Sequence, residues 1–145
     1  MLAAIESMLD LAVATWLADG VTPPLQAYKF KRKTEEQAIA APTQIRHYYF
    51  RLGATLTSAE VVGVGVGTLA RDLELVVQYP ASMSRLEDTM LWDADMLKLY
   101  LEDSANLQGE IINIRARPER VRRLDSGQVE LPLFLTVIYR RRTKA

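Results

Sequence analysis

The sequence predicts an α+β protein: a mostly antiparallel sheet with an N-terminal helix and a second long helix packed on it. Three patterns support this fold class. Apolar residues recur every three or four positions at the N-terminus and again after residue 84, as in a helix with one buried side. Elsewhere apolar and polar residues alternate, as in strands. Runs of strands with few helices favour an antiparallel sheet over alternating parallel units.

The size and composition of the chain are those of one soluble globular unit. Its 145 residues are expected to form a single domain, residues 1–145. With no cysteine, disulfides, thiolate zinc sites and thiol nucleophiles are excluded. The apolar N-terminus has no positive region and is interrupted by Glu6 and Asp10, which argues against a secretory signal. No stretch approaches 18 uncharged apolar residues, so no membrane partner is expected.

The N-terminal half is expected to hold one helix and two strands. The helix covers residues 2–18, because its apolar positions share one face and Gly20 provides a stop. The first strand covers residues 25–32, where aromatic and basic side chains alternate. Residues 33–43 have no regular period and predict a loop. The second strand, residues 45–52, is aromatic on both faces, which indicates a strand that is covered twice or lies at an interface.

Residues 53–70 contain alternating glycines and valines. Gly63, Gly65 and Gly67 predict a flexible hairpin or an extended loop, because glycine weakens a strand. Residues 65–70 also fit a relaxed dinucleotide-binding pattern. That motif needs a following helix to hold the pyrophosphate, whereas a strand is predicted here, so the structural interpretation is favoured.

A strand and the second helix come next. The strand covers residues 72–79, and Pro80 ends it. The helix is expected over residues 84–103, because Ser84 and Glu87 have the spacing of a capping box.

The C-terminal part is expected to add two strands joined by a basic turn. Residues 110–117 form the first strand, with Ile112 and Ile114 inward, and residues 118–128 form the turn. The last strand covers residues 129–140. Pro132 lacks an amide donor, which favours an edge position or a strand start at that point.

The residues that carry catalysis in most enzymes are sparse. His47 is the only histidine, and no adjacent residue supplies a nucleophile or a carboxylate. We therefore expect no enzymatic activity, no catalytic residues, no cofactor and no metal site. A ligand-binding or enzymatic pocket lined by His47, Tyr48 and Tyr49 remains the least favoured alternative.

Charge is strongly separated along the chain, although the formal net charge is zero. Residues 71–110 carry nine acidic and three basic side chains, residues 113–145 carry nine basic and three acidic ones, and residues 1–70 balance. Opposite fields on one small domain suit an oppositely charged partner or a second copy packed head to tail.

This charge separation gives two sets of candidate interface residues. Asp93 and Asp95 are two apart and do not share a helix face, so a solvated acidic face is favoured over a divalent-ion site. The acidic candidates for an oligomer interface are Asp88, Asp93, Asp95, Glu102 and Asp103. The basic candidates for an oligomer or partner interface are Arg115, Arg117, Arg120, Arg122, Arg123, Arg140 and Arg141.

The order of elements from Arg71 onward carries a family resemblance. An alternating strand ends at Tyr79 and Pro80, the Asp- and Leu-rich helix DADMLKLYLED follows, and a further strand and a turn lead to the final strand LPLFLTVIYR. With the amphipathic N-terminal helix, this pattern resembles the tail-terminator (tail-completion) proteins of long-tailed bacteriophages. The resemblance covers residues 2–18 and 71–142 and lies in order and spacing.

The resemblance implies a function. It implies a non-enzymatic structural virion protein whose six copies form a ring that caps the tail tube and joins it to the head-side connector. The expected partners are further copies of the chain, tail-tube protein and connector protein, with nucleic acid only in the ring lumen. The expected location is the neck or tail of the virion, after synthesis in the host cytoplasm. The alternative from a different class is a nucleic-acid-binding module that uses the arginines of residues 115–123 and 140–142.

Overall fold

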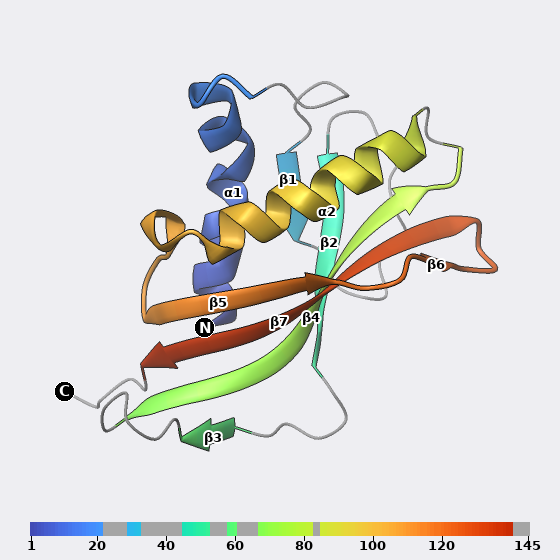
Figure 1. Ribbon diagram of the computed structural model, residues 1–145. Helices are drawn as coiled ribbons and strands as arrows, with labels where there is room; N and C mark the ends of the chain where they lie inside the picture. Colours follow the sequence, from blue (N-terminus) through green and yellow to red (C-terminus); the bar gives the residue numbers. More distant parts are fainter. Residues whose placement is uncertain (22–28, 33–44, 53–57, 61–66, 83–84, 141–145) are drawn as a thin grey trace.

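A computed structural model shows an α+β fold in which two long helices pack on a mostly antiparallel sheet (Figure 1). The residues that it describes are 1–21, 29–32, 45–52, 58–60, 67–82 and 85–140. The helices are α1 (Leu2–Ala18), α2 (Leu86–Glu102) and the short 3-10 helix η1 (Ser104–Asn106). The strands are β1 (Lys29–Arg32), β2 (Ile45–Leu52), β3 (Ser58–Glu60), β4 (Thr68–Pro80), β5 (Ile111–Pro118), β6 (Arg122–Arg123) and β7 (Gln128–Arg140).

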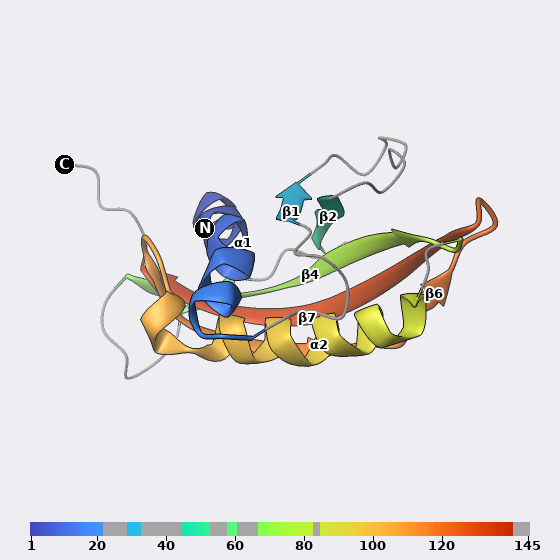
Figure 2. The same ribbon diagram turned by 90° about the horizontal axis from the view of Figure 1, so that it is seen from above.

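The sheet is built around β4 and β7. The strand order is β1-β2-β4-β7-β5, with β3 paired to β4 and β6 paired to β7. All described pairs are antiparallel except β1 with β2. The β4–β7 ladder is continuous from Thr68 opposite Arg140 to Pro80 opposite Gln128. Figure 2 shows these two strands as a long, curved ribbon with α2 running along it.

Both helices pack on the same face of the sheet. Alternation along the strands directs Leu73 and Leu75 of β4 and Leu133 and Leu135 of β7 into one core with α1 and α2. No described helix covers the opposite face, which carries Glu130 among other polar side chains.

Trp16 is the main contact between the two helices. Its ring centroid lies 4.9 Å from that of Trp92 and 6.0 Å from that of Tyr100, and both pairs meet edge to face. The hydroxyl of Tyr100 also donates a hydrogen bond to the carbonyl of Met8 at 2.6 Å. Edge-to-face aromatic pairs stabilise a core beyond the area that they bury, so these contacts fix α1 against α2.

The second helix is capped one residue later than its capping box predicts. The structure starts α2 at Leu86, and its N-cap residue is Arg85 in the left-handed conformation (φ 56°, ψ 36°). Ser84 lies outside the described residues. The one-residue shift places Asp88, in place of Glu87, three positions after the cap, and Arg85 pairs with Asp88 at 3.4 Å.

Two predictions on β5 and β7 are wrong. Ile112 is not among the buried residues, because a β-bulge between Ile111 and Asn113 turns Ile111 inward together with Ile114. Pro132 lies in the interior of the sheet, opposite Val76 of β4.

The interruption between β5 and β6 explains why Pro132 is tolerated there. The carbonyl of Pro132 accepts a hydrogen bond from the amide of Glu119, which lies between those two strands. The N–H and C=O of one strand residue point the same way. The missing donor of Pro132 therefore faces the interruption, and no ladder bond is lost.

Several predicted segments fall wholly or partly outside the described residues. The loop of residues 33–43 lies outside them, as do Gly63, Gly65 and the start of the first predicted strand. Within residues 53–70, β3 and the beginning of β4 are regular strand. In the part of the chain that is described, no helix is long and apolar enough to cross a membrane.

Candidate functional site

The acidic candidates on α2 divide into exposed and internally paired residues. Asp88, Asp95 and Asp103 are exposed, and Asp88 is paired with Arg85. Glu102 is half-buried: it pairs with Lys98 at 2.8 Å and accepts a hydrogen bond from the amide of Ala116. These bonds hold the pKa of Glu102 below its usual value, and the bond with Lys98 has the larger effect. Glu102 therefore ties α2 to β5.

The prediction that Asp93 belongs to an interface is wrong, because its side chain is fully buried. Tyr79 donates a hydrogen bond to Asp93 Oδ2 at 2.5 Å, and Arg46 Nε lies 3.3 Å from the same oxygen. Burial raises the pKa of Asp93 to about 6, although Arg46 and Tyr79 act to lower it. The sequence contained the signal, since Asp93 lies at helical spacing between the buried residues Met90 and Leu97.

The exposed side of α2 carries a line of residues at four-residue spacing that alternates acid and leucine. Two of its leucines are strongly exposed, Leu91 at 68% and Leu99 at 63%. We call this line the α2 stripe, and its members are Glu87, Leu91, Asp95, Leu99 and Asp103, all exposed. The charge pattern alone identified Asp95 and Asp103. Glu87, Leu91 and Leu99 were missed as interface residues, and the four-residue spacing was the available signal.

A groove lies on each side of the α2 stripe. The larger, of about 460 Å³, adjoins Leu91 and has an apolar floor that includes Met90, Val121 and Leu131. The smaller, of about 130 Å³, adjoins Leu99 where α2 meets Trp16 of α1. The exposed leucines are thus continuous with further apolar surface.

Two of the basic candidates project from β5 onto the face of the sheet opposite the helices. Arg115 and Arg117 are exposed and alternate along the strand with the buried Ile114 and Ala116. The guanidinium of Arg117 lies over the ring of Phe134, 5.2 Å from its centroid. We call this surface the arginine patch, and its members are Arg115, Arg117, Phe134 and Ile138.

The remaining basic candidates do not join this patch as one surface. Arg120 and Arg123 are exposed near β6, which pairs with the beginning of β7, whereas Arg140 is exposed at its end. Ten residues of strand separate Glu130, opposite β6, from Arg140, a distance of ~33 Å. Arg120 and Arg123 therefore do not lie beside Arg140. Arg141 lies outside the described residues.

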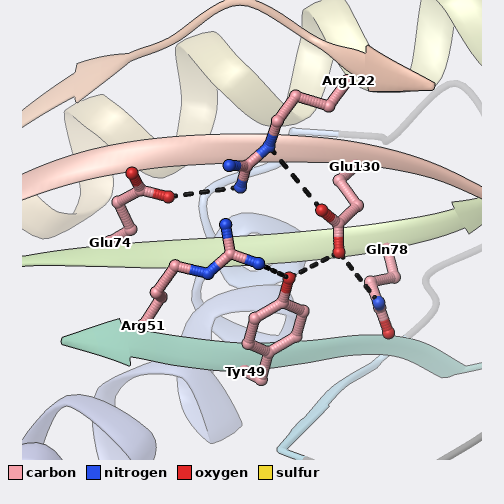
Figure 3. A network of polar contacts seen from close by, with 6 residues as sticks. All are labelled: Tyr49, Arg51, Glu74, Gln78, Arg122 and Glu130. Carbon is pink, nitrogen blue, oxygen red and sulfur yellow. Dashed lines mark hydrogen bonds and ion pairs between the residues drawn. The ribbon is translucent and has the colours of Figure 1, made fainter. Parts of the chain in front are cut away.

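Arg122 belongs to a partly buried polar network within the chain (Figure 3). Its guanidinium pairs with Glu74 at 3.2 Å and with Glu130 at 3.6 Å. Glu130 is buried and also accepts hydrogen bonds from Tyr49 at 2.5 Å and from Gln78 at 3.0 Å. The network joins β2, β4, β6 and β7, so Arg122 serves the fold.

The proposed pocket of His47, Tyr48 and Tyr49 is not formed. Tyr48 points into the core beneath the helices, whereas Tyr49 points to the opposite face and joins Glu130. Neighbouring strand residues face opposite ways, so the two tyrosines cannot line one cavity. No three histidine, aspartate or glutamate side chains of the described ranges are grouped so that they could hold a metal ion.

Compared with known protein families and with curated proteins, the chain matches none of them. The class that the fold and surfaces define is an α+β domain with oppositely charged, partly apolar surfaces on its two sides.

Proposed function

We propose that the protein is a non-enzymatic structural protein that assembles head to tail into a ring. One observation carries the proposal: exposed acidic residues of α2 and exposed arginines of β5 form separate surfaces on opposite sides of the sheet. The α2 stripe lies on the side of the helices, and the arginine patch lies on the open face. Different surfaces that attract one another make a heterologous contact, which closes into a ring when the rotation per copy allows it.

The particular role we propose is that of a tail terminator of a long-tailed bacteriophage. The tail-terminator family, which the order of elements resembles, has an α+β fold, and the observed fold is of that class. In this role a ring of six copies caps the tail tube and contacts the head-side connector, within the neck or tail of the virion. Nucleic acid would pass only through the lumen.

Electron microscopy of the purified protein with assembled tail-tube protein tests this role. We expect ring-shaped particles with a central lumen, and extra density at one end of the tubes. Tail-tube protein alone is the control. Compact particles without a lumen, together with unaltered tube ends, would contradict the role as a terminator.

The second candidate is a nucleic-acid-binding module, favoured by the exposed arginines at one end of the sheet. Arg115 and Arg117 of the arginine patch and Arg120 and Arg123 near β6 are all exposed. If they bind phosphates, affinity for duplex DNA must fall steeply with salt. The logarithm of the binding constant should fall against the logarithm of the salt concentration with a slope of about 0.9 per neutralised phosphate. Titration of labelled duplex and single-stranded DNA at low salt tests this, and the absence of binding there removes the candidate.

A further inference from the structure

We propose that the α2 stripe of one copy packs across the arginine patch of the next copy. Each sheet would then lie between its own two helices and α2 of a neighbour. This inference rests on the proposed function, because it names the surfaces through which the ring forms.

The apolar part of the proposed contact comes from exposed leucines of α2 and from half-buried side chains on the open face of the sheet. Leu91 and Leu99 are exposed at 68% and 63%, and the groove beside Leu91 extends that apolar surface. On the arginine patch, Phe134 and Ile138 are only half-buried, and they alternate along β7 with residues that face the helices. Packing a helix onto an open sheet face is how α+β folds bury apolar surface within one chain.

The charges of the two surfaces are complementary. Asp95 lies between the two leucines of the α2 stripe, and among the described residues it forms no ion pair. Arg115 forms no ion pair with a described carboxylate, although its charge helps to lower the pKa of Glu102, and Arg117 is paired with Glu119, whose side chain is 38% exposed. When two copies meet, Asp95 of one can therefore face an arginine of the other. Such opposite charges favour the correct register and disfavour other partners.

The spacing of the two surfaces also matches. Successive members of the α2 stripe are one helical turn apart, about 6 Å along the axis. On the arginine patch, Arg117 of β5 lies directly opposite Phe134 of β7, and the Cβ atoms of residues paired in this way are about 5 Å apart. A carboxylate flanked by leucines can therefore meet an arginine while a leucine reaches Phe134.

A second copy fits these surfaces better than an unrelated partner. Both surfaces occur on one chain whose formal net charge is zero, and they lie on different sides of its sheet. One copy can therefore use both at the same time without steric competition. Such a contact is heterologous, since the α2 stripe meets the arginine patch rather than another α2 stripe.

The test uses two full-length variants, each with one surface disabled. The stripe variant carries Leu91→Asp and Leu99→Asp, and the patch variant carries Arg115→Asp and Arg117→Asp. Sedimentation velocity should show each variant alone as a single chain. A 1:1 mixture should give a particle of two chains, because the intact α2 stripe of one variant meets the intact arginine patch of the other. The matched control, Leu11→Asp with Leu17→Asp, changes leucines of α1 that are 51% and 50% exposed, and it should assemble like wild type.

The outcomes separate this inference from the proposed function. If wild type assembles and either variant assembles equally well, the ring stands and this interface is wrong. If both variants are single chains and their mixture also remains so, the pairing of α2 stripe with arginine patch is overturned. If wild type is a single chain under all conditions, the proposed function itself fails. Unchanged urea unfolding of each variant excludes a folding defect as the cause.

Discussion

At the scale of single residues, the most constrained group is the buried cluster of Arg46, Asp93 and Tyr79. These side chains come from β2, α2 and β4, so they join the second helix to two strands. The guanidinium of Arg46 also lies over the ring of Phe30, 4.8 Å from its centroid. A buried ion pair is costly to break, because the remaining charge keeps its desolvation penalty without its partner.

We expect Asp93→Leu to lower the free energy of unfolding at pH 7 by about 3–5 kcal/mol, because Arg46 and the Tyr79 hydroxyl then stay buried without their shared partner. Urea denaturation measures this change. Replacing both partners, by Arg46→Met with Asp93→Leu, should be less damaging than Asp93→Leu alone. Asp95→Asn on the exposed side of the helix is the control, with an effect within about 0.5 kcal/mol. A loss in Asp93→Leu no larger than that of the control would contradict the role of the buried cluster.

Asp93 also gives a prediction about pH. Burial raises its pKa from 3.8 to about 6, so between these values the folded protein holds a proton that the unfolded chain releases. The stabilisation from this proton is complete below the unfolded pKa and disappears as the pH rises through the folded pKa. We expect the unfolding free energy of wild type to fall, relative to that of Asp93→Asn, as the pH rises through this window. Above the window the difference between the two proteins should be constant. Urea midpoints measured across the window check this, and a constant difference would refute the raised pKa.

At the scale of elements, the polar network should hold β6 in place. Arg122 links β6 to Glu74 of β4 and to Glu130 of β7, whereas the next residue, Arg123, is exposed. We expect Arg122→Met to speed amide hydrogen exchange in β6 and at the start of β7, because local opening then breaks fewer contacts. Arg123→Met is the matched control. Equal exchange in both variants would show that the network does not restrain the strand.

The packing of α1 on α2 should depend on Trp16. Its ring meets Trp92, Tyr100 and Phe30 edge to face. We expect Trp16→Ala to cost about 3–5 kcal/mol of unfolding free energy, because a large aromatic side chain leaves a cavity. The neighbouring Leu17 is half-exposed, so Leu17→Ala should cost much less. Thermal or urea unfolding compares the two, and similar losses would contradict the assigned core.

The elements themselves were largely predictable from local periodicity. Both long helices, β2, β4 and β7 follow clear three-to-four or two-residue patterns, and their observed bounds lie within a few residues of the predicted ones. The departures come from features without such a period. The β-bulge at Ile112 and the left-handed Arg85 depend on how neighbouring elements meet, and neither leaves a pattern in the local sequence.

At the scale of the whole molecule, the charge separation was visible in the sequence, but the division between surface and interior was not. Asp93 and Arg122 belong to the charged segments and yet serve the fold. Their partners, Arg46 and Glu74, are 47 and 48 residues away in sequence, and such distant pairs are set by the sheet order. Conversely, Leu91 carries no charge and becomes part of the α2 stripe only because α2 leaves that side uncovered.

Sedimentation velocity of the wild-type chain, over a range of concentrations and salt, tests the central claim most directly. At about 0.1 M salt, where the Debye length is about 10 Å, we predict one discrete particle of several chains. Raising the salt to about 1 M should weaken it, because complementary charges contribute to the contact. A species of 16.4 kDa, the mass of one chain, at every concentration and salt would contradict the account.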